Sequence, residues 1–593
     1  MSKAKPQVAV KKPSPSVSDA PAPPRKDGMR ETVESVVIAF VLAFLFRAFE
    51  AEAFVIPTGS MAPTLMGVHK DLTCEKCGFP YRVSASEEQD EDAELSRMLM
   101  ADPQRDPNLR RQAANDLAAR DVVGGICPNC RFPMTIDPQA PEGKKFPTYK
   151  GDRILVAKFP YDFADPSRWD VVVFKYPQKS NENYIKRCVG LPNETVIIHQ
   201  GNIYSRTGDD PQRNIARKPP DKVRAIMQSV YDNDYVQPAL TVEGLPVRWH
   251  GMAEAGGDSW QPLEGNRAYR TDGTAAGEAW LGYQHLVPTQ GDWQQYARGG
   301  KFPPTGSIPP RLISDFYAYN AGWHRNLRLG SDTESQGMHW VGDLILDCDL
   351  TAEPSGKTPN AEAVLRLVKG GRNFDCRIDV LTGVARMSID GNDLGATANT
   401  VVRPGSRHAI SFANVDCQLL LWVDGKVVEF DKPTTYDPIE HDLPTLEDLT
   451  PVRIGAVGTA LEVDHLRILR DVYYIACQYS LDRPQSASLS DYERPVSGFL
   501  SKPATWPEVF AGLRTVEFPL DSDEFLMLGD NSPRSADSRL WKAPDGTPEH
   551  FVNRDLLVGK AVFVYWPHSW NRIPGTGIPF PFFPNFARMK FVR

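Results

Sequence analysis

One serine in this sequence has the setting of an activated nucleophile. Residues 56–65 read I-P-T-G-S-M-A-P-T-L, so Ser60 is flanked by glycine and proline and follows the chain's one long apolar segment by about ten residues. A serine hydroxyl is a weak nucleophile until a neighbouring base removes its proton. The stretch Y-I-K-R at 184–187 offers Lys186 as that base. A lysine beside an arginine is, however, more often a solvated surface residue.

Four cysteines have the spacing of a metal site. The segments 72–80 (L-T-C-E-K-C-G-F-P) and 126–133 (I-C-P-N-C-R-F-P) are near-copies, each with a C-x-x-C pair followed by an aromatic residue and a proline. Such a set predicts a tetrahedral zinc site of structural type, because four thiolates leave no open position for catalysis. Outside the cytoplasm, oxidation to disulfides is the alternative. The cysteines concerned are Cys74, Cys77, Cys127 and Cys130.

The N-terminal region has the pattern of a membrane anchor. A tail rich in Lys, Pro, Ser and Ala, expected to be disordered, precedes the apolar run 36–46 (V-V-I-A-F-V-L-A-F-L-F). The run extends to about 33–49, short against the ~20 residues of a typical span. The basic tail predicts a cytoplasmic N-terminus and an extracytoplasmic remainder. The alternatives are a cleavable secretory signal ending near Ala51-Glu52-Ala53 and a buried helix of a soluble core.

Composition narrows the classes of function. The chain has 593 residues, of which 41% are hydrophobic, so it can bury the cores of several domains. Its formal net charge of -8 gives no sign of a concentrated basic face, and we exclude nucleic-acid binding. The other cysteines are scattered, which excludes a small disulfide scaffold.

Short β-strands are expected on both sides of the lysine and again near the C-terminus. Runs of β-branched and aromatic residues at 154–159, 171–176 and 195–198 are bounded by Asp, Pro and Gly, and Lys186 falls between the last two. Residues 525–541 read F-L-M-L-G-D-N-S-P-R-S-A-D-S-R-L-W, a strand that runs into a polar turn. This turn can hold a network of side chains, and an ordinary turn closed by Asp or Asn is the alternative.

Together these segments resemble the type I signal peptidase family in residue type, in order and in their relation to the anchor. The matching residues, box by box, are 57–65, 151–159, 170–175 with 184–192, and 529–531 with 535–539. Residues 532–534 diverge from the family pattern. Asp537 and Arg539 match a structural ion pair of the family. The resemblance covers about 31–66, 147–204 and 515–593, and the rest is insertion.

The resemblance implies a Ser-Lys dyad in a mainly β fold, with Ser60 as nucleophile and Lys186 as general base. By position in its box, Ser535 matches the residue whose hydroxyl orients the lysine amine. Thr58 matches the residue whose hydroxyl joins the Ser60 backbone N–H in the oxyanion hole. Burial against apolar neighbours would lower the pKa of the lysine toward about 7, so that the neutral amine can accept a proton.

A second, larger insertion follows the lysine box. After a helix expected within 221–235, strand-like runs between Gly, Asp and Asn turns predict a β-sandwich or jelly roll. The stretches 419–425, 452–455 and 463–466 resemble laminin-G and concanavalin-like domains, which implies a carbohydrate or protein ligand. Trp422 is more often a core residue than a sugar platform, and we assign no binding residue. The expected strands are 317–319, 344–350, 363–368, 376–380, 408–412, 418–430 and 465–469.

The expected architecture is mainly β: a signal-peptidase-type β catalytic core after one N-terminal transmembrane helix, with an inserted zinc ribbon and an inserted β-sandwich. The expected ranges are the tail 1–30, the anchor 31–52, the catalytic core 53–73, 147–204 and 515–593, the ribbon 74–146, the sandwich 240–485, and linkers 205–239 and 486–514.

The expected function is that of a membrane-bound serine endopeptidase that removes N-terminal signal peptides from exported preproteins. Its implied partners are preproteins with Ala-x-Ala-type cleavage sites and the lipid bilayer of the cell membrane, crossed once, and catalysis needs no cofactor. The alternative is a cell-surface binding protein or a zinc-ribbon scaffold with a degenerate peptidase core. That alternative predicts the loss of Ser60, Lys186 or Ser535, and none is lost.

Overall fold

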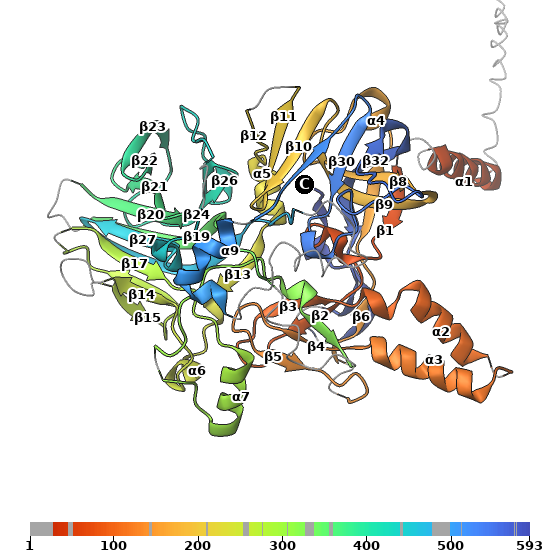
Figure 1. The fold of residues 1–593 in the computed structure, drawn as a ribbon, viewed down its shortest axis with the longest axis horizontal. Coiled ribbons are helices and arrows are strands. Elements are labelled where there is room, and N and C mark those ends of the chain that lie inside the picture. Colours follow the sequence, from red (N-terminus) through yellow and green to blue (C-terminus); the bar gives the residue numbers. More distant parts are fainter. Residues whose placement is uncertain are drawn as a thin grey trace, which may run out of the picture. The chain divides into compact units, whose positions relative to one another are not determined.

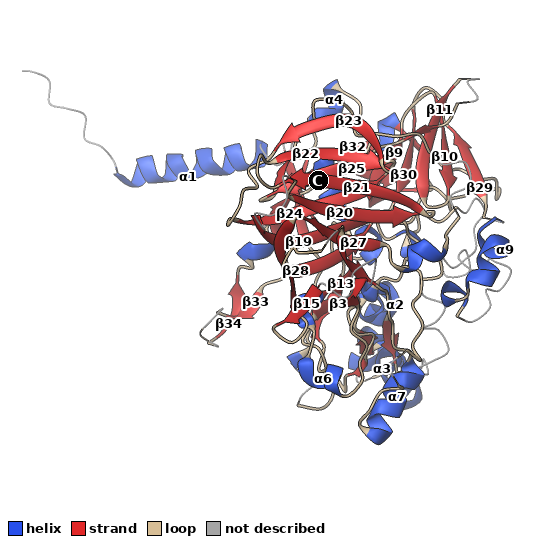
Figure 2. Ribbon diagram, turned by 90° about the vertical axis from the view of Figure 1, so that its left-hand side faces the viewer, coloured by secondary structure: helices blue, strands red, loops and turns tan. Residues whose placement is uncertain are grey.

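The computed structural model divides the chain into two compact units, Met1–Ala51 and Glu52–Arg593. Most of the regular elements of the second unit are β-strands (Figure 2). The residues that the structure describes are 28–45, 51–102, 104–141, 145–208, 212–252, 260–275, 277–304, 306–325, 337–354, 360–438, 443–476, 498–511, 513–573, 576 and 578–593.

The first unit contains the helix α1 (Gly28–Leu45). Its large apolar side chains from Val33 to Val41 are exposed. Within the described part of the chain, no helix has both the length and the apolar character that a membrane crossing needs. The transmembrane helix expected over 31–52 is therefore not confirmed. Residues 1–27 and 46–50, which hold most of the expected tail and the end of the expected anchor, lie outside the described residues.

The segments around Ser60 and Lys186 form one sheet with strands from distant parts of the chain. Figure 1 shows the yellow and orange strands beside the blue ones in this sheet. Strand β35 (Lys590–Phe591) pairs with β32 outside the main path. The strands are, in spatial order, β1 (Ala51–Val55), β7 (Arg153–Ala157), β32 (Leu557–Trp566), β8 (Val171–Tyr176), β9 (Lys179–Gly190), β30 (Glu524–Leu528) and β31 (Val552–Asn553).

The uninterrupted apolar sequence of β8 follows from its place in the middle of this sheet. Side chains alternate between the two faces of a strand. Val171 and Val173 join a core cluster with Ile56 on one face, whereas Val172 and Phe174 join another with Phe525. Because both faces are covered, neither set of alternate positions needs to be polar. A smaller sheet runs β12 (Asn214–Ile215), β11 (Asn202–Thr207), β10 (Glu194–His199) and β29 (Thr515–Pro519).

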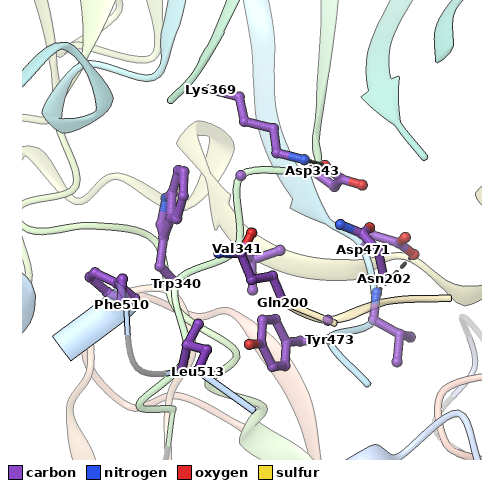
Figure 3. Close-up of a pocket in the computed structure, with 13 residues that line it drawn as sticks. Gln200, Asn202, Trp340, Val341, Asp343, Lys369, Asp471, Tyr473, Phe510 and Leu513 are labelled. Carbon is purple, nitrogen blue, oxygen red and sulfur yellow. Dashed lines mark hydrogen bonds and ion pairs between the residues drawn. The ribbon is translucent and has the colours of Figure 1, made fainter. Parts of the chain in front are cut away.

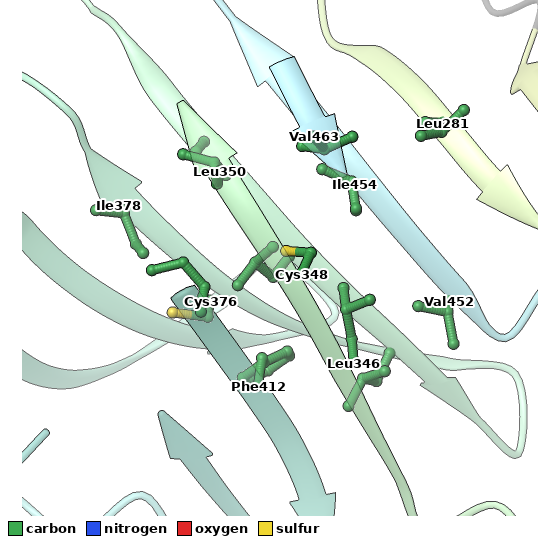
Figure 4. Close-up of a cluster of buried hydrophobic side chains, with 14 of the residues drawn as sticks. Leu281, Leu346, Cys348, Leu350, Cys376, Ile378, Phe412, Val452, Ile454 and Val463 are labelled. Carbon is green, nitrogen blue, oxygen red and sulfur yellow. The ribbon is translucent and has the colours of Figure 1, made fainter. Parts of the chain in front are cut away.

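The second insertion contains two sheets whose inner faces share one hydrophobic core. In Figure 4, Leu346, Leu350 and Phe412 come from one sheet, and Ile378 and Ile454 from the other. The first sheet is β15 (Trp260–Leu263), β16 (Ala268–Thr271), β28 (Thr459–Arg470), β19 (Leu344–Pro354), β24 (Arg407–Val415), β25 (Gln418–Val423) and β26 (Lys426–Val427), with β13 (Gln228–Asp232) beside β28. The second is β14 (Trp249–Met252), β17 (Ala279–Tyr283), β27 (Val452–Val457), β20 (Glu362–Lys369), β21 (Arg372–Asp379), β22 (Val384–Ile389) and β23 (Asn392–Asn399).

Most of the strands expected in this insertion are present, and two expectations were wrong. The run 317–319 is not a strand but overlaps the 3₁₀ turn η6 (Ala318–Asn320). The run 418–430 is broken after β25 by a tight turn, where Asp424 and Gly425 both have positive φ. Within 221–235 the structure has the short helix α5 (Pro220–Ile226), and the strand β13 follows it. Trp422 is buried in a separate hydrophobic cluster, which also contains Val223 of α5.

The first insertion, the ribbon expected over 74–146, folds around its two cysteine turns. One small sheet is β3 (Pro80–Ser84), β2 (His69–Thr73) and β6 (Thr148–Tyr149); the other is β18 (Gly322–His324), β4 (Val122–Ile126) and β5 (Pro133–Thr135). The helices α2 (Glu91–Ala101) and α3 (Pro107–Arg120) connect the two halves. Strand β18 belongs to the second insertion by sequence. The ribbon is thus completed by a strand roughly two hundred residues away from β4.

The second insertion also covers the ribbon with helices. Leu240 of α6 (Pro238–Val242) and Trp293 of α7 (Gln290–Gly299) lie in the same core cluster as the four cysteines. The indole N–H of Trp293 donates to the carbonyl oxygen of Cys130 at 3.1 Å. The remaining short elements are α4 (Pro160–Phe163), α9 (Trp506–Ala511) and the hairpin β33 (Trp570–Arg572) with β34 (Pro579–Phe583).

Candidate active site

The serine and the lysine expected to act together are in direct contact. Ser60 lies on the buried 3₁₀ turn η2 (Gly59–Met61), which follows β1, and Lys186 lies on β9 opposite Val172 of β8. The Lys186 Nζ donates a hydrogen bond to Ser60 Oγ at 2.8 Å. A separation of this size lets a proton pass from the hydroxyl to a neutral amine without rearrangement.

The surroundings of Lys186 shift it toward its neutral form. The side chain is only 4% exposed, and burial lowers its pKa to about 8, against the opposing pull of the Asp537 and Asp530 carboxylates. The Tyr184 ring centre lies 5.5 Å from the amine. At neutral pH a usable fraction of such a lysine is unprotonated, which is the state a general base requires.

Ser535 and Thr58 lie close to this pair but make no hydrogen bond with it. Ser535 is fully buried, and its hydroxyl has no hydrogen-bond partner among the described residues. A Cβ added to Gly529 would lie 2.2 Å from Ser535 Oγ and 2.5 Å from the Ser60 carbonyl oxygen, so this glycine permits the close approach. Thr58 is exposed at the N-terminal end of η2, and its hydroxyl caps no backbone group there.

A buried ion pair next to the lysine was not anticipated from the sequence. Arg187 donates from two nitrogens to the two carboxylate oxygens of Asp530, each at 2.7 Å, and both side chains are fully buried. Thr64 donates to Asp530 at 2.5 Å. The pair joins β9 to the turn after β30 and to the segment after Ser60. Nothing in the local sequence separates Arg187 from a solvated arginine, so only its burial reveals this role.

The last box forms the network that its many hydroxyl and charged groups indicate. Arg539 and Asp537 make the ion pair implied by the family resemblance, with 2.7 Å between nitrogen and oxygen. Asp537 also accepts from the backbone N–H of Gly529 at 3.0 Å. Asn531, for which the sequence suggested no role, donates from its backbone N–H to the Ser60 carbonyl and from its amide to the Gly59 carbonyl, both at 3.0 Å.

The four cysteines of the ribbon converge as the zinc hypothesis requires. Their sulfurs all lie within 4.8 Å of one another, with 3.5 Å for Cys74–Cys130 and for Cys77–Cys127. All four are buried thiols rather than disulfides. Tetrahedral zinc with Zn–S distances of about 2.3 Å needs sulfurs roughly 3.8 Å apart. The four residues therefore fit a structural zinc ion.

The two cysteine turns share one backbone pattern. The first residue after each C-x-x-C pair, Gly78 or Arg131, has positive φ and donates its N–H to the carbonyl of the first cysteine, at 2.8 and 2.9 Å. Repetition of the same turn explains why the two sequences are near-copies.

A second polar cluster, His69, Asp71 and His568, is less suited to a cation. The Arg588 guanidinium donates to His568 Nδ1 at 2.7 Å, which leaves the proton of that ring on Nε2, 3.0 Å from Asp71. A metal would need the lone pair at this Nε2. The Arg82 guanidinium, 2.9 Å from Asp71, adds further positive charge.

A surface pocket lies at the junction of β10, β11 and the sandwich (Figure 3). Aromatic side chains of Trp340, Tyr473 and Phe510 line it. Lys369 and Asp343 in its wall form an ion pair at 2.6 Å. The pocket contains neither Ser60 nor Lys186, so it is separate from the dyad.

Comparison with known proteins points to one family. The family model described as "Signal peptidase, peptidase S26" matches residues 139–238 and 471–566. This match includes Lys186 and the last box, whereas Ser60 lies before its first residue. Ser60 is linked to the matched residues by its 2.8 Å contact with Lys186 and by the hydrogen bond that its carbonyl accepts from the Asn531 backbone N–H.

Relatives from three bacteria share short stretches with the chain. The signal peptidase I of Pseudomonas aeruginosa is 48% identical over 71 residues, which are 10% of this chain and 25% of that protein. That of Buchnera aphidicola subsp. Acyrthosiphon pisum is 36% identical over 95 residues, 14% of this chain and 30% of that protein. That of Leptolyngbya laminosa is 36% identical over 90 residues, 14% of this chain and 43% of that protein. The match thus spans less than half of each relative's length.

Solved structures that resemble the chain include two distant matches. The carbohydrate-binding module CBM66 from Bacillus subtilis has 9% identity and a TM-score of 0.18, covering 38% of this chain and 92% of that one. The exoplasmic/lumenal domain of VIP36 has 9% identity and a TM-score of 0.22, covering 40% and 88%. The sequence match is the more informative finding: residues 139–238 and 471–566 match the signal peptidase family, peptidase S26, and the relatives that share stretches with this chain are signal peptidases I.

Proposed function

We propose that this protein is a membrane-bound serine endopeptidase that removes N-terminal signal peptides from exported preproteins. The observation that carries the proposal is the 2.8 Å contact between Ser60 Oγ and the amine of the buried Lys186. The family match and the name "Signal peptidase I" of the relatives support the substrate class. Because both members of the dyad are present and in contact, a degenerate peptidase core is disfavoured.

The proposed mechanism is an acyl-enzyme reaction. Ser60 Oγ attacks the carbonyl carbon before the cleavage site, and its proton passes to the neutral Lys186 amine and then to the nitrogen of the leaving peptide. A water molecule, deprotonated by the same lysine, releases the acyl group. The Ser60 backbone N–H and the exposed Thr58 hydroxyl would stabilise the oxyanion, where one donor is typically worth about 3 kcal/mol. The buried Ser535 hydroxyl would orient the amine in the substrate complex.

Membrane attachment is part of the proposal. Helix α1 carries a row of exposed apolar side chains, and only 14 residues separate its last residue, Leu45, from Ser60. A bilayer buries such side chains favourably. A site tethered this closely would meet signal peptides at the membrane surface. We propose one crossing of the cell membrane, a cytoplasmic N-terminus and an extracytoplasmic catalytic domain.

We also propose that Cys74, Cys77, Cys127 and Cys130 hold one structural zinc ion. Their burial and the spacing of their sulfurs support this assignment. The ion would have four protein ligands and no open position, so no catalytic step passes through it. The sandwich is proposed to bind a carbohydrate or protein ligand.

The test uses the full chain in detergent with a labelled preprotein. We expect wild type to release the signal peptide, and Ser60→Ala and Lys186→Ala each to lower kcat/KM by at least about 10³-fold, because the two residues act as a unit. Matched controls are Ser406→Ala and Lys426→Ala, whose side chains are exposed, and these should cleave like wild type. Undiminished cleavage by either dyad variant would contradict the proposed mechanism. Absence of cleavage by wild type would contradict the proposed function.

A further inference from the structure

A turn of the second insertion packs directly on the serine turn. Tyr319 of η6 is 1% exposed, and its ring lies against the Cα of Gly59. A Cβ at Gly59 would lie 2.2 Å from a carbon of that ring, which is shorter than any real contact between such atoms. Glycine is therefore the only residue type at position 59 that allows the Tyr319 ring to pack against the serine turn.

The next residue, Asn320, is hydrogen-bonded to the side chain of Asn531, which in turn binds the backbone of the serine turn. Its amide nitrogen donates to Asn531 Oδ1 at 2.7 Å, and Asn531 Nδ2 donates back to Asn320 Oδ1 at 2.8 Å. Asn531 Nδ2 also donates to the Gly59 carbonyl at 3.0 Å. An amide group has two N–H donors, so both donors of Asn531 are used. The Asn531 side chain has one orientation that satisfies all three bonds.

Asn531 thus fixes the backbone on both sides of the nucleophile. Its amide group binds the carbonyl of Gly59, and its backbone N–H binds the carbonyl of Ser60. The same backbone carries the Ser60 N–H that is proposed for the oxyanion hole. A small rotation of this turn would move both the Oγ and the N–H away from the substrate carbonyl.

The ribbon supports η6 from behind. Strand β18 begins two residues after Asn320 and pairs with β4, Gly322 opposite Gly125. The N–H of Ile126, at the end of β4, donates to the Ala321 carbonyl at 3.3 Å. Cys127 follows directly in the chain. The cysteine turn, β18, η6 and the serine turn are therefore connected through consecutive contacts.

We propose that Asn320 and Tyr319 are positioning residues for the nucleophile, so that the insertions form part of the peptidase machinery rather than an appended domain. This inference rests on the proposed peptidase function. The side-chain hydrogen bonds of these two residues go to Val68 and Asn531 rather than to Ser60 Oγ or Lys186, and Asn320 acts through Asn531. Loss of either contact should lower the rate of acylation without changing how the lysine ionises.

The first experiment is a double-mutant cycle on preprotein cleavage with Asn320→Ala, Asn531→Ala and the double variant. We expect Asn320→Ala to lower kcat by about 10- to 100-fold, the scale of a misplaced reacting group, with KM changed less than about threefold. If Asn320 acts through Asn531, the double variant should be no slower than Asn531→Ala alone. The midpoint of the pH–rate profile should stay at the wild-type value, which an altered lysine environment would not allow.

The second experiment adds a methyl group at Gly59 and removes the facing ring of Tyr319. Gly59→Ala should be at least about 100-fold slower than wild type, because its methyl group collides with the Tyr319 ring. Gly59→Ala combined with Tyr319→Ala should recover at least about tenfold, since the space is restored. Because removal of the clash could also restore folding, circular dichroism measures the folded fraction of each variant, and rates are compared per folded enzyme. Asn392→Ala, an exposed position on β23 of the same insertion, is the matched control and should match wild type.

The outcomes separate this inference from the proposed function. If wild type cleaves and Ser60→Ala does not, the function stands. The positioning role is then overturned by a wild-type kcat in Asn320→Ala, by multiplicative effects of Asn320→Ala and Asn531→Ala, or by a Gly59→Ala variant that Tyr319→Ala fails to rescue. If Asn320→Ala does not fold, the Gly59–Tyr319 exchange alone decides.

Discussion

At the scale of single residues, the site depends on one lysine that is kept from water. An exposed lysine would be protonated at neutral pH, with a pKa near 10.4. Burial disfavours the charged form, and here it outweighs the attraction of two nearby carboxylates, Asp537 and Asp530. Each of these carboxylates is paired with an arginine, Arg539 and Arg187 respectively, and the charge of Arg539 also lowers the pKa of Lys186.

This balance predicts the pH dependence of the reaction. Only the neutral amine accepts the Ser60 proton, so kcat/KM should rise about tenfold per pH unit below the pKa, reach half its maximum near pH 8 and then level off. The measurement is cleavage of a peptide without titratable groups from pH 6 to 10, with circular dichroism at each pH as the control for folding. A rate independent of pH in this range, or a midpoint near 6, would contradict the assignment of Lys186 as the base.

At the scale of elements, the ribbon shares a sheet and a hydrophobic core with the second insertion and is not an isolated insertion. Its sheets are short, and an isolated two-stranded hairpin, such as β4 and β5 would form alone, is only marginally stable. Here β18, α6 and α7 of the second insertion supply the additional strand and the cover. The four cysteines belong to the hydrophobic core that the ribbon and the second insertion share.

Zinc removal tests the ribbon. Metal analysis of the purified chain should find about one zinc ion, and a strong chelator should release it and lower the midpoint of thermal unfolding, because four buried thiolates lose their shared cation. Cys77→Ser should lose the zinc. Cys348→Ala, a buried thiol of the sandwich, should keep it even if its packing defect lowers stability. A chain without zinc and with Cys74 and Cys77 oxidised would replace the zinc site by disulfides.

At the scale of the whole second unit, a buried charge network joins the peptidase segments to the sandwich. Lys218, which follows β12, lies 2.7 Å from Asp416 in the turn between β24 and β25, and 2.8 Å from Asp471, which follows β28. All three are at most 3% exposed. Burial raises the pKa of Asp471 to about 7, which shows how strongly this interior resists a second negative charge.

Removing the positive charge of Lys218 should lower the stability of the second unit. Lys218→Met leaves two carboxylates buried without their cation, and loss of one partner of a buried ion pair typically costs about 3–5 kcal/mol. The urea midpoint of unfolding should fall by a corresponding amount. Lys426→Met, exposed on β26, is the matched control and should leave the midpoint within error. An unchanged midpoint in Lys218→Met would mean that the network contributes little to the junction.

The amino-acid sequence by itself determined the features that depend on neighbours along the chain. The strands β7, β8 and β10 follow from runs of β-branched residues, and the two cysteine turns from their repeated spacing. Ser60 and Lys186 could be named because each lies in a local motif of the resembled family. Their contact over 126 residues was an inference from that resemblance, and the distance of 2.8 Å agrees with it.

Tertiary structure alone decided the contacts between residues whose local sequence carries no signal. Arg187 is a buried partner of Asp530, Asn320 reaches Asn531 across 211 residues, and β18 completes the ribbon from the second insertion. Each is an ordinary arginine, asparagine or three-residue strand when read along the chain. Their roles arise from burial, because a polar group removed from water must find a partner wherever the fold brings one within hydrogen-bonding distance.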